Sequence, residues 1–269
     1  MANFDPRRFA VVIASCDKSE DLWKPLLQSF ARFWPDCPVQ KYLITNLATP
    51  DTGETKVIAV GDDRGWSANL KRAAAHLEED YLLLHVDDLF LVKTVDTARL
   101  AETFCWVEKN APNCVRLNAT SDNYPVTLMP RRMGDAPFGA LDRGWDYRVS
   151  TVLSLWKRQT LMDIICDNES AWEFEIHGSL RSDRYEGFYG TFENFFQVSN
   201  AVIRGKWRPS ALVKLRNCGL DVSIGSRPVM GKREIVYWYI KERITKLFSF
   251  LSPQARRKIR LAARRMRQA

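Results

Sequence analysis

The chain lacks several features that would assign it to a common class of protein. Its 269 residues include only three histidines and six cysteines. The cysteines form no CxxC pair and no spacing typical of a zinc site. No run of 18 apolar residues occurs, which argues against a membrane-spanning helix, and residues 1–8 lack the features of a secretory signal. We therefore expect a cytoplasmic protein with reduced thiols, without a histidine cluster or a Ser/His/Asp arrangement for hydrolysis.

The net positive charge is concentrated near the end of the chain. The net charge is +8, yet residues 241–269 contain ten Lys or Arg and one Glu, a net +9, so the other 240 residues sum to −1. The hydrophobic fraction of 46% is ordinary for a globular protein. We therefore expect a near-neutral domain over residues 1–232 and a basic helical tail over residues 233–269.

Strand and helix signals alternate in the first part of the chain. Residues 9–16 form a compact apolar run, residues 22–34 repeat apolar side chains at helical spacing, and residues 39–45 again favour a strand. This order predicts parallel strands joined by a right-handed crossover. The fold class expected is α/β, with a mostly parallel central sheet flanked by helices.

The apolar run over residues 80–92 carries two adjacent carboxylates, Asp87 and Asp88. Such a run is typical of a strand buried on both faces, and open α/β sheets bind ligands beyond the carboxyl ends of their strands. Two buried like charges are costly unless a cation neutralises them, and Mg²⁺ or Mn²⁺ prefers oxygen ligands. We interpret the pair as a metal–diphosphate site. From spacing alone, a solvated turn in which both side chains face water is an equal alternative.

Acidic and aromatic residues are interleaved in a second stretch, residues 169–179. Glu173 and Glu175 alternate there with Trp172 and Phe174. This pattern fits a partly buried, acid-lined wall better than a free surface. The alternative is that one or both glutamates form structural ion pairs with Arg158 or Arg181.

These two stretches resemble the nucleotide-sugar glycosyltransferases of the GT-A fold. In that family a helix start containing Gly and Asn, here residues 64–69, precedes the strand that carries the DxD motif, here ending in Val86-Asp87-Asp88. Residues 170–175 are similar to the acidic segment in which inverting members keep their catalytic base. The likeness covers roughly residues 8–210 and is closest to enzymes predicted in bacterial surface-polysaccharide clusters. The first DxD position is Val86 or His85, so the resemblance leaves open which aspartate binds metal.

The resemblance implies a GT-A-like, Rossmann-type fold and a transferase. The reaction implied is transfer of a sugar from a nucleotide-diphosphate donor to a hydroxyl of a surface glycan, with inversion. Asp87 and Asp88 would bind Mn²⁺ or Mg²⁺ and the sugar diphosphate. Glu175, or else Glu173, would deprotonate the acceptor, because aromatic neighbours can raise the pKa of a carboxyl by desolvation.

Nine residues are expected to contact the donor. Aspartates of the first loops would accept hydrogen bonds from the nucleobase or ribose, and nearby cations would contact phosphate. The alternatives are helix capping and turn formation for the aspartates, and solvated surface charges for the cations. The donor-binding residues expected are Ser15, Asp17, Asp62, Asp63, Arg64, Trp66, Asn69, Lys71 and Asp87.

Apolar residues recur at helical spacing within the basic tail. A basic amphipathic helix is typical of an interfacial membrane element. We expect residues 241–269 to bind an anionic membrane surface, at the inner face of the cell membrane, which suits a lipid-linked acceptor. We expect no nucleic-acid partner, because the helix has an apolar face. Deletion of this segment is expected to preserve turnover of a soluble acceptor.

Two other functions stay open. One is a sugar-nucleotide nucleotidyltransferase of similar topology. Such enzymes usually carry a glycine-rich, lysine-containing loop after the first strand, whereas residues 15–20 contain no glycine. The other is a non-catalytic protein that docks on a membrane or on nucleic acid through its basic tail.

Overall fold

The computed structural model describes residues 3–119, 130–134, 136–145, 147–225, 227–247 and 251–268. The strands are β1 (Phe9–Ala14), β2 (Gln40–Thr45), β3 (Lys56–Ala59), β4 (Tyr81–Val86), β5 (Leu89–Leu91), β6 (Cys114–Arg116), β7 (Gly139–Ala140), β8 (Ser154–Lys157), β9 (Phe188–Gly190), β10 (Val198–Asn200), β11 (Val202–Ile203) and β12 (Lys206–Trp207). The α-helices are α1 (Glu20–Phe33), α2 (Trp66–Ala75), α3 (Thr97–Asn110), α4 (Arg158–Ile164), α5 (Ala171–Arg181), α6 (Pro209–Asn217), α7 (Lys232–Leu247) and α8 (Pro253–Gln268). Short 3₁₀ turns are η1 (Pro6–Arg8), η2 (Asp17–Ser19) and η3 (Ser182–Arg184).

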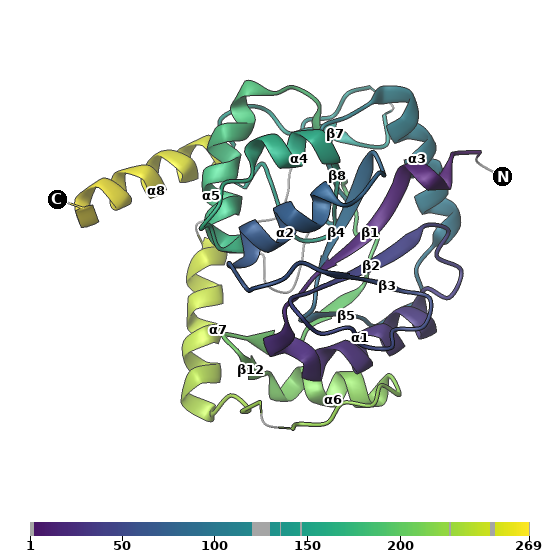
Figure 1. Cartoon of the computed structure of the whole chain (residues 1–269). Coiled ribbons are helices and arrows are strands. Elements are labelled where there is room, and N and C mark those ends of the chain that lie inside the picture. Colours follow the sequence, from purple (N-terminus) through teal and green to yellow (C-terminus); the bar gives the residue numbers. More distant parts are fainter. Residues whose placement is uncertain are drawn as a thin grey trace.

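One large sheet forms the centre of the molecule (Figure 1). Within the described residues it has eight strands in the order β3-β2-β1-β4-β8-β6-β9-β7. The first four are mutually parallel, β8 is antiparallel to both of its neighbours, β9 is parallel to β6, and β7 is antiparallel to β9. Four of these seven pairings are parallel. The predicted α/β fold with a mostly parallel sheet flanked by helices is confirmed.

The alternation of side chains along β1 explains why both faces of the sheet are covered. Phe9, Val11 and Ile13 pack in one cluster with apolar residues of α1, α3 and α6. Ala10 and Val12 point the other way and pack with residues of α2, α4 and α5. A strand buried on both faces carries an uninterrupted apolar run, and this is why β1 and β4 were recognisable in the sequence.

The register between β1 and β4 brings the carboxyl ends of the two strands to the same edge of the sheet. The two strands are parallel, and Ala14 pairs with Val86 at their carboxyl ends. The residue after each strand is polar: Ser15 follows β1 and Asp87 follows β4. Because the two strands end together, both residues lie at the same edge of the sheet.

A buried arginine clamps the segment that precedes β8. The Arg148 side chain is 1% exposed. It donates hydrogen bonds to the carbonyl oxygens of Leu141 (2.9 Å), Tyr185 (3.0 Å) and Ser182, and its guanidinium stacks on Phe188 at 4.2 Å. A buried guanidinium is tolerated when its donors are satisfied in this way.

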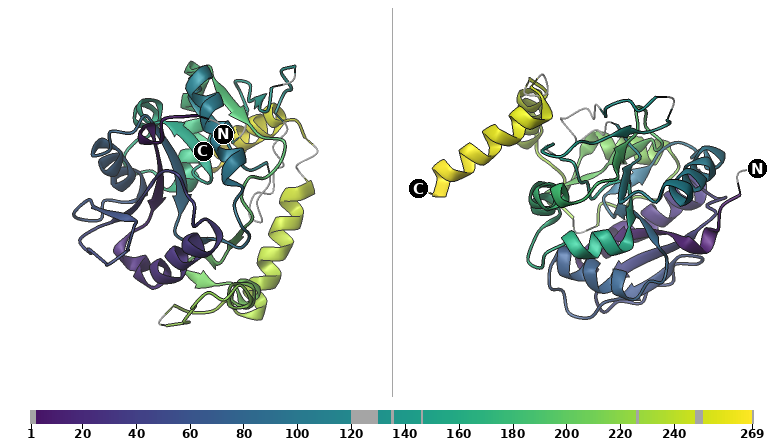
Figure 2. Two further views of the ribbon diagram at one scale, coloured as in Figure 1. Left: turned by 90° about the vertical axis from the view of Figure 1, so that its right-hand side faces the viewer. Right: turned by 90° about the horizontal axis from the view of Figure 1, so that it is seen from above.

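The C-terminal helices are joined to the domain by ion pairs. Lys206 pairs with Glu234 of α7 at 2.6 Å, and Arg257 of α8 pairs with Asp183 at 2.8 Å. Helix α7 runs alongside the body, and α8 extends outward from it (Figures 1 and 2). Among the described residues, no helix is both long and apolar enough to span a bilayer.

Candidate active site

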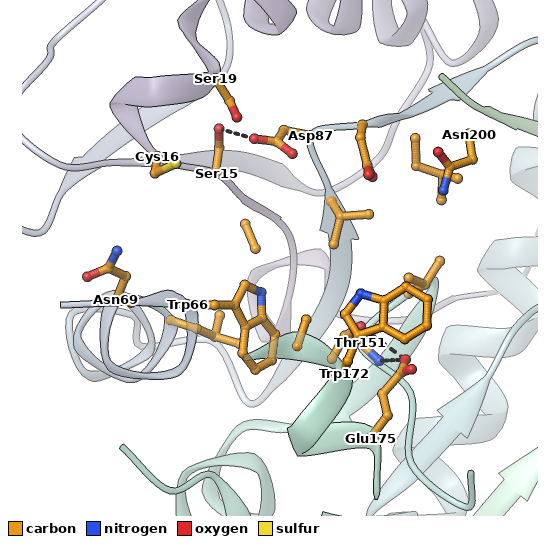
Figure 3. A pocket seen from close by; sticks show the side chains of 18 of the residues that line it. Ser15, Cys16, Ser19, Trp66, Asn69, Asp87, Thr151, Trp172, Glu175 and Asn200 are labelled. Carbon is orange, nitrogen blue, oxygen red and sulfur yellow. Dashed lines mark hydrogen bonds between the residues drawn. The ribbon is translucent and has the colours of Figure 1, made fainter. Parts of the chain in front are cut away.

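A cavity of about 710 Å³ lies at the carboxyl ends of β1 and β4. This is the edge at which α/β sheets bind ligands, and the volume suits a small-molecule ligand. Figure 3 shows the side chains of 18 of the residues that line it. Of the twelve residues predicted for the site, seven line the cavity: Ser15, Asp63, Trp66, Asn69, Asp87, Asp88 and Glu175. The five that do not are Asp17, Asp62, Arg64, Lys71 and Glu173.

Asp87 and Asp88 both line the cavity and are half-buried. Ser15 Oγ donates to Asp87 Oδ2 at 2.7 Å and accepts a bond from Trp23 Nε1, also at 2.7 Å. Burial raises the pKa of the Asp87 carboxyl. Burial, together with the charge of Asp87, raises the pKa of Asp88 to about 7. The two carboxyls therefore resist simultaneous ionisation, as closely spaced acids do when no cation lies between them.

The donor set at this end of the cavity fits a hard divalent cation. Besides the two carboxylates, Asn200 of β10 lines the cavity, and its Oδ1 is buried without a hydrogen-bond partner among the described residues. Strand β10 places it there, because Asn200 pairs with Leu89, the residue after Asp88. Carboxylate and amide oxygens are ligands that Mg²⁺ and Mn²⁺ accept. Within the described residues, no group of three or more His, Cys, Asp or Glu gathers at a point.

Glu175 lies on α5 and is 6% exposed. Its Oε1 accepts three hydrogen bonds, from Ser150 Oγ (3.1 Å), Thr151 N (2.9 Å) and Thr151 Oγ1 (3.0 Å). Figure 3 shows Thr151 beside Glu175. All the hydrogen bonds that described residues make to this carboxylate fall on Oε1. The side chain is thereby held in one orientation, and Oε2 is the oxygen to which an acceptor hydroxyl could give a proton.

Glu173 has a different environment from Glu175, although both lie on α5. Ser170 and Glu173 form a capping box, in which Glu173 Oε2 accepts from Ser170 N at 2.9 Å and from Ser170 Oγ at 2.8 Å. Arg181, the expected alternative partner of the glutamates, pairs with Glu169 instead. Of the two candidate bases, the structure therefore places Glu175 in the cavity and Glu173 at the helix start.

The start of α2 is organised around Asp63. Its carboxylate accepts from Lys18 Nζ (3.0 Å), Gly65 N (3.0 Å) and Asn69 Nδ2 (2.9 Å). These donors, with Lys18 first, lower the pKa of Asp63 to about 2. Gly65 precedes α2 with φ of +88°, a left-handed conformation that favours glycine. Trp66 follows, and its buried Nε1 lacks a partner among the described residues, although the ring lines the cavity.

Asp17 stabilises a loop and does not line the cavity. Its carboxylate accepts from the backbone N–H groups of Asn46 (2.8 Å), Leu47 (2.9 Å) and Ala48 (3.1 Å). Burial raises the pKa of Asp17, but these three donors outweigh burial and lower it below its ordinary value. The loop after β2 is thus tied to the loop after β1.

We expect Asp17→Ala to lower the free energy of unfolding by about 1–3 kcal/mol, because it leaves three backbone donors without their acceptor. Urea unfolding at pH 7 measures this. The loss should shrink at acid pH, since the stabilisation given by a carboxyl of lowered pKa disappears once that carboxyl is protonated. The exposed Asp62→Ala is the control. Weaker donor binding with unchanged stability would instead assign Asp17 to the donor.

The remaining predicted cationic and acidic residues lie outside the cavity wall. Asp62 and Arg64 are exposed, and Lys71 Nζ lies 3.6 Å from the carboxylate of Asp167. In this structure the backbone carbonyl of Asp62 accepts from Arg72, and Arg64 N donates to Asn69 Oδ1 at 3.1 Å. Their predicted contacts with the donor stay predictions.

Several cavity residues were not predicted from the sequence. Trp172 lies one turn before Glu175 on the same face of α5, which the Ser170–Glu173 capping signature could have indicated. Asn200 gives no sequence signal, because only the pairing of β10 with β5 brings it to the site. Trp238, Lys241 and Arg260 of the C-terminal helices also line the cavity and were not predicted to do so.

No protein-family model matches the chain, and no curated protein does. Solved structures do. Staphylococcus aureus TarS 1–349 in complex with UDP matches with a TM-score of 0.50 and 12% identity, over 70% of this chain and 59% of that one. The full TarS structure matches with a TM-score of 0.50 and 14% identity, over 90% and 44%. The mannosyltransferase PcManGT from Pyrobaculum calidifontis, in complex with GDP-Man and Mn²⁺, matches with a TM-score of 0.48 and 12% identity, over 97% and 78%.

The fold is that of a GT-A-like glycosyltransferase. The resemblance found in the sequence is thereby confirmed at the level of the fold. The chain spans about three fifths of the TarS 1–349 structures, 58–60% of their length. The GT-A-like architecture accounts for the position of the cavity, since the crossover helices leave the carboxyl edge of the parallel strands open.

Proposed function

We propose that this GT-A-like protein transfers a sugar from a nucleotide-diphosphate donor to a hydroxyl group of a surface-glycan acceptor. The main support for this proposal is that Asp87, Asp88 and Glu175 line a single cavity at the ligand-binding edge of the sheet. An acid pair suited to a metal and a buried glutamate suited to a base are the two groups that this transfer needs. The fold likeness to TarS bound to UDP supports the nucleotide part.

Asp87 and Asp88 would hold Mg²⁺ or Mn²⁺, with Asn200 Oδ1 as a further oxygen ligand. When bound, the metal supplies positive charge that neutralises the diphosphate as it departs. Ser15 keeps the Asp87 carboxylate oriented toward the cavity through its 2.7 Å hydrogen bond. Asp63, held by Lys18 and Asn69 at the start of α2, remains ionised and can accept hydrogen bonds from the donor.

Glu175 would take the proton of the acceptor hydroxyl as its oxygen attacks the anomeric carbon. The attack occurs opposite the departing diphosphate, so the configuration at that carbon inverts. Ser150 and Thr151 hold Glu175 Oε1, which restricts the carboxylate to one orientation. A base fixed in this way loses little conformational entropy when it reaches the transition state.

The acceptor is proposed to be lipid-linked, with the protein at the inner face of the cell membrane. Exposed apolar side chains on the C-terminal helices support this, among them Tyr237 (59%), Ile240 (51%) and Ile259 (50%). Residues 241–269 add a net charge of +9. Near anionic lipid each basic residue contributes about 1 kcal/mol, reduced by salt. No nucleic-acid partner is proposed.

Thermal unfolding with UDP-, GDP- and CMP-sugars tests the proposal. At a concentration about 100-fold above Kd, one of these donors should stabilise the protein by about 2.7 kcal/mol. For a chain of this size that raises Tm by about 5–10 °C. With a UDP- or GDP-sugar the increase should require Mn²⁺ or Mg²⁺, since the diphosphate is held through the cation. A CMP-sugar has a single phosphate, so the proposed site should favour the other two donors.

UMP and GMP are the matched controls for the UDP- and GDP-sugars, because they lack the diphosphate and should show little metal dependence. A Tm increase with a nucleoside triphosphate, and with no sugar nucleotide, would favour a nucleotidyltransferase. If none of these compounds raises Tm with or without metal, the cavity is not a nucleotide-sugar site.

A further inference from the structure

The cavity has a second wall, formed by the C-terminal helices. Trp238 and Lys241 of α7 and Arg260 of α8 line it together with Trp172 of α5. We call these four residues the basic-aromatic wall. Trp172 is 62% exposed, an unusual exposure for tryptophan. The wall combines two cations with aromatic rings.

Each cation of the wall is positioned by an aromatic ring. Lys241 Nζ lies 4.9 Å from the centre of the Trp238 ring, three residues earlier on α7. The guanidinium of Arg260 lies 4.7 Å from the centre of the Tyr147 ring, and Tyr147 also lines the cavity. Stacking on a ring holds a long cationic side chain in place without removing its charge.

Two members of the wall, Trp172 and Arg260, are connected to the elements that carry Glu175. Arg257 fixes α8 to the end of α5 by its ion pair with Asp183, 2.8 Å, and by a 3.5 Å bond from Nη2 to the carbonyl of Ser179. Tyr147, on which Arg260 stacks, belongs to the same short segment as Ser150, which donates to Glu175. Arg260 is thus attached to the elements that position the candidate base, and Lys241 lines the same cavity.

A different cation acts on the two aspartates. Arg227 lowers the pKa of both aspartates, while Asp21 raises the pKa of Asp87 and Asp87 raises that of Asp88. Arg227 makes two 2.7 Å hydrogen bonds to Asp21 and is held there. The aspartates therefore have a nearby cation that does not belong to the basic-aromatic wall.

We propose that Lys241 and Arg260 bind a phosphate group of the acceptor, while Trp172 and Trp238 contact the faces of its sugar rings. This inference rests on the proposed function of the cavity and adds the acceptor class: a glycan linked through phosphate. Two cations on separate helices match a group that shares its negative charge among several oxygens. The apolar faces of the tryptophans match the C–H faces of a pyranose.

Equilibrium binding to the full-length protein tests the proposal without turnover. The probes are hexyl phosphate esters of glucose, galactose and N-acetylglucosamine, each compared by calorimetry with the neutral hexyl glycoside of the same sugar. At least one phosphate ester should bind about 10-fold or more tightly than its neutral counterpart. The difference should decrease as salt is added.

Substitutions assign the effect to the wall. Lys241→Met and Arg260→Met should each weaken phosphate-ester binding by about 10-fold and change neutral glycoside binding less than twofold. Lys241→Arg should retain most of the affinity. Trp172→Ala should weaken both ligands, and Trp172→Phe should restore them. Lys258→Met is the matched control, since Lys258 is an exposed cation on α8 outside the cavity wall.

Three results would overturn the proposal. The first is equal binding, or no binding, of the phosphate esters and the neutral glycosides by the wild-type protein. The second is an equal loss of phosphate-ester affinity in Lys258→Met. The third is a rise in the Kd of the donor, with phosphate-ester binding unchanged, in Lys241→Met and Arg260→Met, which would assign both cations to the donor diphosphate. Failure of the proposed function would give a different result from failure of this inference. In that case no sugar nucleotide would bind, regardless of whether the phosphate esters bind.

Discussion

Glu175→Gln is expected to lower kcat for sugar transfer by about 10³-fold, within the range that general-base catalysis contributes. The amide keeps an oxygen that can accept from Ser150 and Thr151, the partners of Glu175 Oε1, so the fold should be preserved. It cannot take a proton from the acceptor. The Kd of the donor should change less than twofold, because the aspartates hold the diphosphate.

Glu173→Gln is the matched control for this substitution. It is two residues away on the same helix, and glutamine can replace glutamate in a capping box. Its kcat should stay within about twofold of the wild type. Steady-state kinetics with the donor found by thermal unfolding, together with direct measurement of donor affinity, compare the two variants. Full activity in Glu175→Gln, or a large loss only in Glu173→Gln, would reject Glu175 as the base.

The parallel half of the sheet could be predicted because its strands leave a strong signal. Buried parallel strands need apolar residues on both faces, so β1 and β4 appear as uninterrupted apolar runs. The polar residues that follow them, Ser15 and Asp87, then had to lie at one edge. Their 2.7 Å hydrogen bond is the direct result of that register.

The segment around β8 was harder to predict. Residues 149–156 have the composition of one strand, but the strand is confined to Ser154–Lys157. Leu153, directly before β8, has φ of +47°, so the extended conformation does not continue from residue 149 into the strand. The preceding residues form a loop whose Thr151 holds Glu175 by two hydrogen bonds. Composition cannot distinguish a strand from a buried loop that is ordered by a distant side chain.

Residues 169–179 illustrate a missed local signal. The alternation of acids and aromatics indicated a wall of the site, which is where α5 lies, but the segment is a helix. Ser170 and Glu173 match the capping-box pattern, which marks a helix start. With a helix in place, Trp172 and Glu175 fall on one face. Both residues line the cavity.

The position of the basic tail relative to the cavity could not be predicted from its charge. Its composition suggested a membrane segment separate from the chemistry, whose deletion would spare turnover of a soluble acceptor. The structure places Lys241 and Arg260 in the cavity wall. We therefore now expect deletion of residues 241–269 to impair turnover of soluble acceptors too. Long-range packing of helices leaves no trace in local composition, so the sequence could not reveal this.

Asp87→Asn with Asp88→Asn is expected to abolish metal-dependent turnover, with a loss of about 10³-fold or more in kcat/KM. Amides are weaker ligands for hard cations than carboxylates and carry no charge to offset that of the metal. The donor should then produce the same small Tm increase with and without Mn²⁺. The exposed Asp36→Asn is the control, since Asp36 lies outside the cavity wall.

The same double substitution is expected to stabilise the metal-free protein at neutral pH. Burial and the neighbouring charge raise the pKa of Asp88 to about 7 from an ordinary 3.8. The folded state therefore holds a proton that the unfolded state has lost between these pH values. Stability must fall as pH rises through this interval. Asparagine removes that cost, so the gain over wild type should be absent near pH 4 and reach about 1–2 kcal/mol at pH 8.

Urea unfolding in EDTA at pH 4.5 and pH 8 measures this gain. Binding of a cation should offset the free-energy cost of burying the two carboxylates. At pH 8, Mn²⁺ should therefore raise the stability of the wild-type protein to at least that of the variant. The stability of the variant itself should not change. The loss of turnover and the change in stability are thus measured independently. A double variant that is less stable than wild type at pH 8 in EDTA would mean that the carboxylates support the fold. Their proximity would then have a structural explanation, and the metal site would lose its physical basis.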